Sequence, residues 1–264
     1  MKADEARKII DAQLQQLVEA LVQGQAETLK RYLAVLAKFH RYSFRNVLLI
    51  MAQRPDATHV AGFHAWKQLG RFVKKGEKGI AIIAPVARRP STEEESEPET
   101  QPPPAAFKVS YVFDVVQTEG EPLAQLAEAQ GEPGLYLPRL KELVAEHQIA
   151  LSYAATLGGP DGVSRGGSIL LREGLSAAEE FSVLVHEFGH ELLHHHGNGQ
   201  SKTERETEAE AVACVVSEAI GLKAGDAARD YIQYYRGDAE TLMRSLCAIQ
   251  DVASLILRGL FGAG

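Results

Sequence analysis

The feature that most constrains this chain is an apolar stretch that carries histidines at helical spacing, VLVHEFGHELLHHH, residues 183–196. Apolar residues with a period of about 3.6 predict an α-helix with one buried face. Ser176 and Glu179 fit a capping box, which places the start of this helix just after Ser176. Imidazoles and carboxylates inside such a helix are costly to bury unless each finds a partner. The stretch therefore predicts a buried helix that holds a ligand.

The spacing of the polar residues indicates a metal ion as that ligand. His186 and His190 project from consecutive turns of one helix face, so both imidazoles can bind one tetrahedral zinc ion. Glu187 points about 100° further round the helix, where its carboxylate can take a proton from a zinc-bound water. His194 shares the histidine face but is expected at the solvated end of the helix. The alternative, two surface histidines on an ordinary helix, fits the apolar neighbours poorly.

A third ligand is expected from the next helical stretch, TERETEAEAVACVVSEAI. Its apolar face centres near Ala209 when residues are placed at 100° intervals. Glu206 lies about 60° from that centre and is the best candidate for the third ligand. Glu210, one turn further on, is expected to hydrogen-bond a ligand imidazole. Glu204 and Glu208 are expected on an acidic face in contact with solvent.

A second feature is a basic, aromatic segment inside an acidic chain. Residues 28–79 carry eleven Lys and Arg against two Asp and Glu, whereas the rest of the chain carries 17 against 33. Cations interleaved with flat rings are typical of surfaces that bind single-stranded nucleic acid. Phe39, Phe44 and Phe63 are expected in the core. The candidate contacts are Arg41, Tyr42, Arg45, Trp66, Lys67, Arg71, Lys74, Lys75 and Lys78. The alternative is that most of these rings are core and most of these cations form a solvated face.

The pattern of elements indicates an α+β protein with two domains, residues 1–122 and 123–264. IAIIAPV and KVSYVFDVV read as the two strands of a hairpin. Between them, residues 88–106 are acidic and rich in proline, and this composition predicts a disordered insertion at the hairpin tip. An interdomain linker is the alternative for this insertion. The second domain is expected to be rich in helices, with a small sheet that includes residues 168–171.

Composition also bears on the compartment. No apolar run approaches the roughly 18 residues that a membrane-spanning helix needs. The N-terminus has no apolar secretion signal, and the two cysteines lie in helical patterns as free thiols would. A cytoplasmic protein without a membrane partner is expected.

The metal motif resembles a known group of enzymes. HEFGH followed by an E-x-x-A-E-x-x-A helix is similar to the zincin-type metallopeptidases with a glutamate third ligand, including groups linked to phage repressors and conjugative plasmids. The resemblance implies His186, His190 and Glu206 as zinc ligands and Glu187 as the catalytic base. Zincins also bind the substrate as an added strand at a sheet edge, and residues 168–171 are expected to supply that edge.

The N-terminal part resembles a second family. RYSFRNVLLIMAQ, followed by WKQLGRFVKKGEKG and VFD, is similar to the single-stranded-DNA-binding N-terminal domain of the ArdC antirestriction family, over about residues 4–122. Together the two resemblances imply an antirestriction protein of a mobile element that binds single-stranded DNA and hydrolyses a protein or peptide substrate with zinc. One alternative is a non-enzymatic protein that coats DNA and holds a structural zinc. Another is a regulatory peptidase that cleaves a repressor. The acidic insertion is expected to face away from the DNA path.

Overall fold

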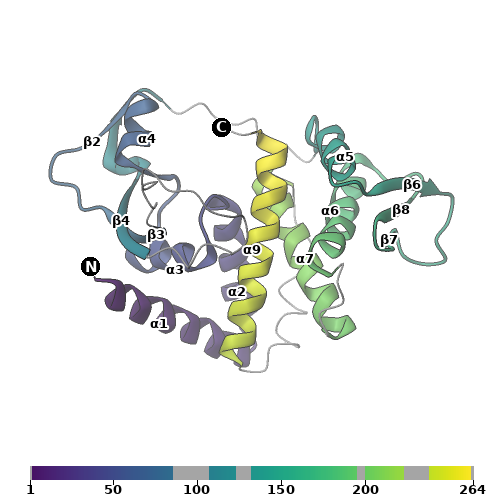
Figure 1. Cartoon of the computed structure of the whole chain (residues 1–264), viewed down its shortest axis with the longest axis horizontal. Helices are drawn as coiled ribbons and strands as arrows, with labels where there is room; N and C mark the ends of the chain where they lie inside the picture. The colour runs from purple at the N-terminus through teal and green to yellow at the C-terminus, as the bar shows by residue number, and fades with distance from the viewer. Residues whose placement is uncertain (1, 86–106, 123–131, 195–199, 223–237, 263–264) are drawn as a thin grey trace, which may run out of the picture. The chain divides into compact units, whose positions relative to one another are not determined.

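The structure, a computed structural model, describes residues 2–85, 107–122, 132–194, 200–222 and 238–262. It mixes helices with small sheets, and this confirms the predicted α+β class (Figure 1). The chain divides into two compact units. Residues 1–13 and 48–123 form the first unit, and residues 14–47 and 124–264 form the second.

These units differ from the predicted domains over residues 14–47. Helix α1 (Ala3–Val22) and helix α3 (Phe44–Gln53) each contribute to both units, whereas α2 (Ala26–Lys38) belongs to the second. The reason is packing, because α2 contacts helix α7 (Lys202–Ala219). In addition, the buried amide of Gln250 donates hydrogen bonds to the carbonyls of Phe39 and Tyr42. A segment that reads as N-terminal in the sequence thus completes the core around α7.

The first unit is built on a three-stranded antiparallel sheet in the order β1-β4-β3. Strands β3 (Ile80–Pro85) and β4 (Phe107–Asp114) pair from Ile80 opposite Val112 to Pro85 opposite Phe107, and this confirms the predicted pairing. The insertion at 88–106 lies outside the described residues. Strand β1 is Val60–Gly62, α4 is Phe63–Gln68 and η1 is Val115–Gln117, while β2 (Arg71–Val73) pairs with β5 (Thr118–Gly120).

Trp66 is part of the core of this unit. Its side chain is 2 % exposed, and its indole N–H donates to the carbonyl of Phe113 at 2.8 Å. The buried carboxylate of Asp114, next along β4, accepts from the backbone N–H groups of Thr58 and Val116. A buried indole has no free face for a base. The prediction of Trp66 as a DNA contact is therefore wrong. Composition alone does not distinguish an aromatic ring that packs in the core from one that faces solvent, and this ring packs in the core.

We expect Trp66→Ala to lower the free energy of unfolding by about 3–5 kcal/mol, because it empties a large buried site. Trp66→Phe should cost less, since a ring still fills part of the space while one hydrogen bond worth about 1 kcal/mol is lost. Urea unfolding followed by circular dichroism measures both. Trp66 is the single tryptophan of the chain, so its emission also serves as a control. A shift of that emission on adding single-stranded DNA to the folded protein would contradict the buried position.

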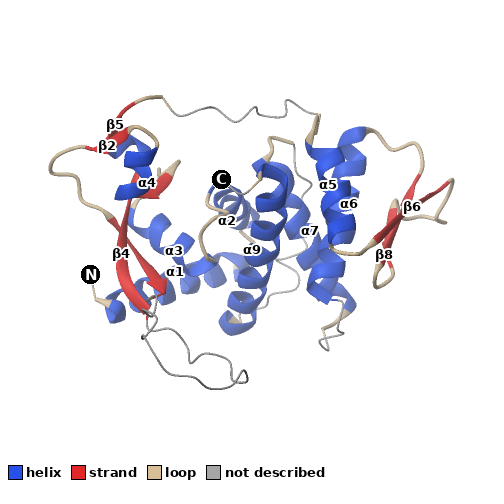
Figure 2. Cartoon of the chain, turned by 45° about the horizontal axis from the view of Figure 1, so that its top comes forward, coloured by secondary structure: helices blue, strands red, loops and turns tan. Residues whose placement is uncertain are grey.

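The second unit packs helices beside a small sheet (Figure 2). Its helices are α2, α5 (Tyr136–Glu146), α6 (Ala177–His194), α7 and α9 (Ala239–Phe261). Its sheet has the order β6-β8-β7, formed by β6 (Ala150–Ala154), β7 (Gly162–Ser164) and β8 (Ser168–Arg172). β8 lies parallel to β6 and antiparallel to β7.

This strand order corrects one expectation. Residues 168–171 lie in β8, which is the central strand and has both edges paired, so they cannot offer a free edge. The edge strand next to α6 is β7, which lies within the glycine-rich segment of residues 158–167.

Among the helices that the structure describes, none is both long and apolar enough to cross a bilayer.

Candidate metal centre and nucleic-acid surface

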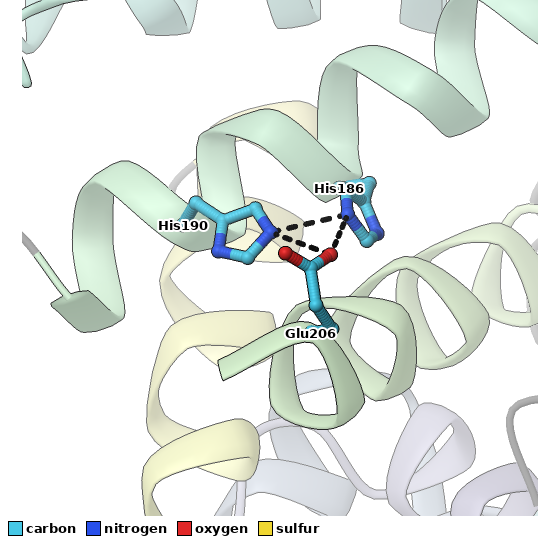
Figure 3. Close-up of side chains that lie close together, drawn as sticks. All are labelled: His186, His190 and Glu206. Carbon is cyan, nitrogen blue, oxygen red and sulfur yellow. Dashed lines mark hydrogen bonds and ion pairs between the residues drawn. The ribbon is translucent and has the colours of Figure 1, made fainter. Parts of the chain in front are cut away.

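The orientation of helix α6, which carries the histidines, follows from its capped N-terminus and its buried apolar face. The capping box is present: Ser176 Oγ accepts from the Glu179 N–H at 3.3 Å, and the Glu179 carboxylate accepts from the Ser176 N–H at 2.8 Å. Phe181, Leu184 and Phe188 are completely buried. The helix therefore cannot rotate, and its His186 and His190 face stays directed toward α7 (Figure 3).

His186, His190 and Glu206 bring one ligand atom each to a single point (Figure 3). The Nε2 atoms of His186 and His190 are 3.2 Å apart. Glu206 Oε2 lies 3.5 Å from the first and 3.4 Å from the second. Ligand atoms bound to tetrahedral zinc at about 2.0–2.1 Å are about 3.4 Å apart. The three side chains thus fit a zinc-sized ion, and three protein ligands leave one position for water or substrate.

Glu210 orients one of these imidazoles. Its Oε2 accepts a hydrogen bond from His186 Nδ1 at 3.2 Å, which leaves Nε2 of that ring free for an ion. Burial lowers the pKa of His186, but the hydrogen bond to Glu210 and the charge of Glu187 outweigh it and raise the pKa above 6.5. The same bond lowers the pKa of Glu210. The structure therefore places Glu210 in hydrogen-bond contact with His186, one of the two candidate histidine ligands.

Glu187 lies beside the cluster without joining it. Its side chain is buried, and burial raises the pKa of its carboxyl against the opposing charge of His186 and a hydrogen bond from the Ser164 backbone N–H. Strand β7 approaches it closely at Gly162. A Cβ at Gly162 would lie 2.8 Å from Glu187 Cγ and 2.6 Å from Val183 Cγ1. Only glycine allows the strand to lie this close to the carboxylate.

These residues line one cleft of about 920 Å³. On one side the cleft is bounded by residues 160–166, which include β7, and on the other by the first two turns of α7. His186, Glu187 and His190 line it from α6. An extended chain can therefore reach both the edge of β7 and the histidine cluster.

Three neighbouring residues are placed differently from expectation. Glu204 and Glu208 are 7 % and 2 % exposed and do not form a solvated face. The cause is that α7 packs against α2, α6 and α9, and such a helix has little face left for solvent. Glu208 instead accepts from Gln200 Nε2 at 3.0 Å. His194, expected at a solvated end, is also buried, and its Nδ1 is 3.0 Å from Gln200 Oε1.

The pKa shifts predict how metal binding depends on pH. An ion needs a neutral imidazole, so it must displace the proton that His186 retains below its raised pKa. Burial and the neighbouring His186 lower the pKa of His190 to about 4, so His190 competes only in strong acid. As pH falls, zinc affinity should begin to decline above pH 6.5 with about one proton taken up per ion released.

Calorimetric zinc titrations in buffers of different ionisation enthalpy measure that proton number. Glu210→Gln should move the onset of the decline to lower pH, because the bond that retains the proton is lost. Release of two protons per bound ion near pH 6.5 would contradict the assignment of unequal pKa values to the two rings.

The first unit carries most of the cations that were predicted to contact DNA. Lys67, Lys74, Lys75 and Lys78 are exposed. Arg71 is half-buried, and its guanidinium donates to Thr118 Oγ1 at 2.8 Å and to the carbonyl of Glu121, so it ties β2 to β5. Lys67, Lys75 and Lys78 are therefore better placed for phosphate than Arg71, while the exposed Lys74 ammonium donates to the carbonyl of Val116 at 3.0 Å.

Aromatic residues that the sequence did not select are exposed on the same unit. Phe63 on α4 and Phe72 on β2 are 51 % and 54 % exposed, and Tyr111 on β4 is 48 % exposed. The expectation that Phe63 is core is wrong, whereas Phe39 and Phe44 are buried as predicted. A signal for Phe72 existed in the alternation of β2, where Arg71 and Val73 are half-buried and the residue between them faces outward.

Comparison with known proteins identifies the N-terminal half. Residues 3–113 match the family model of the N-terminal domain of the anti-restriction factor ArdC. The N-terminal part of the chain is thus an ArdC-like domain. The ArdC-like domain includes α4, β2, β3 and most of β4, and with them the exposed lysines and phenylalanines described above.

Two solved structures of the antirestriction protein ArdC from plasmid R388 are also similar to this chain. The metal-free structure has 19% identity and a TM-score of 0.46, and covers 82% of this chain and 84% of that one. The Mn(II)-bound structure has 17% identity and a TM-score of 0.48, and covers 88% of this chain and 99% of that one.

An uncharacterized protein of Bacillus anthracis is 24% identical over 278 residues. That match takes in 83% of this chain and 45% of the relative, so the chain spans about half the relative's length.

Three of the candidate DNA contacts in the ArdC-like domain belong to the second compact unit. Arg41 and Arg45 are exposed there. Tyr42 is half-buried, and burial raises the pKa of its hydroxyl to about 12. Their part in DNA binding stays a prediction.

Proposed function

We propose that this ArdC-like chain is an antirestriction protein that binds single-stranded DNA and cleaves a protein substrate with a zinc ion. The observation that carries the hydrolytic half is the convergence of His186, His190 and Glu206 beside the buried Glu187. The DNA-binding half is supported by the ArdC family model over residues 3–113 and by the exposed lysines and aromatic rings in that range.

The residues of the cleft divide the proposed hydrolysis among them. His186, His190 and Glu206 would hold the ion, and Glu210 keeps the His186 ring in the orientation that binding requires. A bound zinc supplies a Lewis acid that lowers the pKa of a coordinated water to about 7. Glu187 accepts the proton of the attacking water and returns it to the leaving amine, a task that suits a carboxyl whose pKa is raised.

The edge of β7 offers a place for the substrate backbone. This strand lies between the cleft and β8, and its outer edge is unpaired among the described residues. An extended peptide can add to such an edge through main-chain hydrogen bonds. The peptide would then pass the Glu187 carboxylate, against which Gly162 packs.

A direct test of this function uses the purified chain loaded with zinc and, separately, with manganese. The expected result is hydrolysis of a quenched fluorescent casein that stops when a chelator removes the ion. Zinc binding without hydrolysis of casein or of proteins pre-bound to the same DNA would favour the non-enzymatic DNA-coating alternative. Cleavage restricted to one repressor would favour the regulatory peptidase.

For the DNA-binding half, we expect Lys74→Glu with Lys75→Glu to weaken binding to a single-stranded oligonucleotide and to flatten its salt dependence. Each lost phosphate contact should reduce the slope of log K against log salt by about 0.7. Phe72→Ala should weaken binding about 5- to 150-fold with the slope unchanged, because a stacked ring contributes roughly 1–3 kcal/mol per base.

Fluorescence anisotropy across a salt series measures both effects. Lys8→Glu, at an exposed position of α1 in the same unit, is the matched control and should change little. Equal losses for Lys8→Glu and the lysine pair would show that only net charge matters and would contradict a localised binding surface.

A further inference from the structure

Three of the carboxylates that line the cleft contact other side chains. Glu206 contacts both histidines, and Glu210 is bonded to His186. Asp161 accepts from Arg172 Nε at 2.6 Å. The remaining carboxylates that line the cleft are the buried Glu187 and Glu191.

Glu191 is used to hold the turn that follows β7. Its carboxylate, 6 % exposed, accepts from Ser164 Oγ at 2.5 Å, from the Gly166 N–H at 2.8 Å and from the Gly167 N–H at 2.7 Å. The backbone is thus held on both sides of Arg165, whose own N–H donates to Ser168 O. The side chain of Arg165 remains exposed at the rim of the cleft.

The positive charges that line the cleft, unlike these carboxylates, are not in ion pairs among the described residues. Arg165, Lys202 and Arg205 line the cleft together with the metal-binding cluster. In the described part of the chain, no ion pair joins any of the three to a carboxylate. These three cations are therefore charged groups of the cleft that remain available to bind a carboxylate of a substrate.

Two of these cations lie at a helix N-terminus, where a positive charge does not stabilise the helix. Lys202 and Arg205 are in the first turn of α7, just after its N-cap Ser201. Positive charges at a helix N-terminus oppose the helix dipole and destabilise the helix. Residues that break a local rule without a structural gain are expected at functional sites. Here they direct positive charge into the cleft opposite Arg165.

We propose that the cleft selects peptides with an acidic side chain next to the bond to be cut, with Arg165 and Arg205 as specificity-determining residues. This inference rests on the peptidase function proposed above and names its substrate class. A guanidinium binds a carboxylate through two parallel hydrogen bonds, and the held turn at Arg165 reduces the entropy lost on binding. A peptide fits better than nucleic acid, because a row of phosphates along the cleft would also meet Glu187 and Glu206.

The test uses the full chain with Glu187→Gln, loaded with zinc, so that binding is measured without cleavage. The probes are two fluorescein-labelled octapeptides that differ only in two central residues, Glu in one and Gln in the other. The acidic peptide should bind at least about tenfold more tightly at low salt. Arg165→Gln and Arg205→Gln should each reduce this preference severalfold, and the double variant should abolish it.

Arg244→Gln is the matched control, since Arg244 is exposed on α9 in the same unit and does not line the cleft. Zinc content and melting temperature of each variant show that the fold and the centre are intact. Equal binding of the two peptides, no binding of either, or a preference that survives the double variant would overturn the proposal. Displacement of the acidic peptide from the cleft by a short DNA oligonucleotide would do the same and would point to nucleic acid as the ligand.

The two proposals can fail separately. If the acidic peptide is preferred but the unaltered zinc-loaded chain cleaves nothing, the peptidase function fails and the selective cleft remains as a binding site. If the unaltered chain cleaves the acidic and neutral peptides at equal rates, the peptidase stands and the inference about Arg165 and Arg205 fails.

Discussion

Glu187→Gln is expected to abolish peptide hydrolysis while leaving the fold and the metal centre in place. The amide has nearly the same shape and fits the buried site between α6 and β7, but it cannot accept the proton of the attacking water. General-base catalysis contributes typically 10²–10⁴-fold, so the rate should fall by at least about that factor. The Ser164 N–H, which donates to the Glu187 carboxylate, can donate to the amide oxygen instead.

The measurement is hydrolysis of a fluorogenic peptide at saturating zinc, with zinc content determined in parallel. Glu179→Gln is a suitable control, because Glu179 lies on the same helix but outside the cleft. A Glu187→Gln variant that cleaves at the unaltered rate would remove Glu187 from the mechanism. Loss of zinc from this variant would instead show that Glu187 supports the ion.

His190→Ala is expected to remove the stabilisation that zinc gives to the second unit. An ion bound to the folded state alone adds about 2.7 kcal/mol when its concentration is 100 times its dissociation constant. For a chain of this size, that should raise the melting temperature by roughly 5–10 °C. Without His190, two ligands remain, and the zinc-dependent rise should largely disappear.

Melting curves in zinc and in a chelator separate this effect from packing. In the chelator the variant should melt close to the unaltered protein, because burial and His186 already disfavour a charge on His190. His59→Ala is the control, since His59 is exposed and lies outside the cluster. An unchanged zinc-dependent rise in His190→Ala would place the ion elsewhere.

The grouping of His186, His190 and Glu206 could be predicted from the sequence largely because its geometry is local. Four residues make about one helical turn, so the spacing of His186 and His190 already places two imidazoles side by side. Glu206 ranks first because it lies about 60° from the centre of the apolar face, nearer than the other glutamates. The expectation of a solvated face failed for both Glu204 and Glu208, since a helix that packs against three others has almost no solvated face.

Other features depend on contacts between distant parts of the chain and could not be read locally. Phe63 and Trp66 lie three residues apart on α4, yet one is exposed and the other buried. The choice follows from Phe113, whose carbonyl receives the indole hydrogen bond. Likewise, the position of β7 at the sheet edge is set by its pairing with β8, which leaves no signal in the short strand itself.

The grouping of residues 14–47 with the unit that carries His186, His190 and Glu206 affects how the protein can be divided. Leu29, Leu33 and Leu36 on α2 are completely buried, and α2 packs on α7, which carries Glu206. A fragment that starts at residue 123 would leave the α2-facing side of α7 open to water and prone to aggregation. Fragment boundaries chosen from sequence homology alone would therefore destabilise the C-terminal unit, because they remove α2 from it. A soluble fragment of the C-terminal part would need α2 supplied, for example by co-expression or by joining residues 14–47 to it through a designed linker.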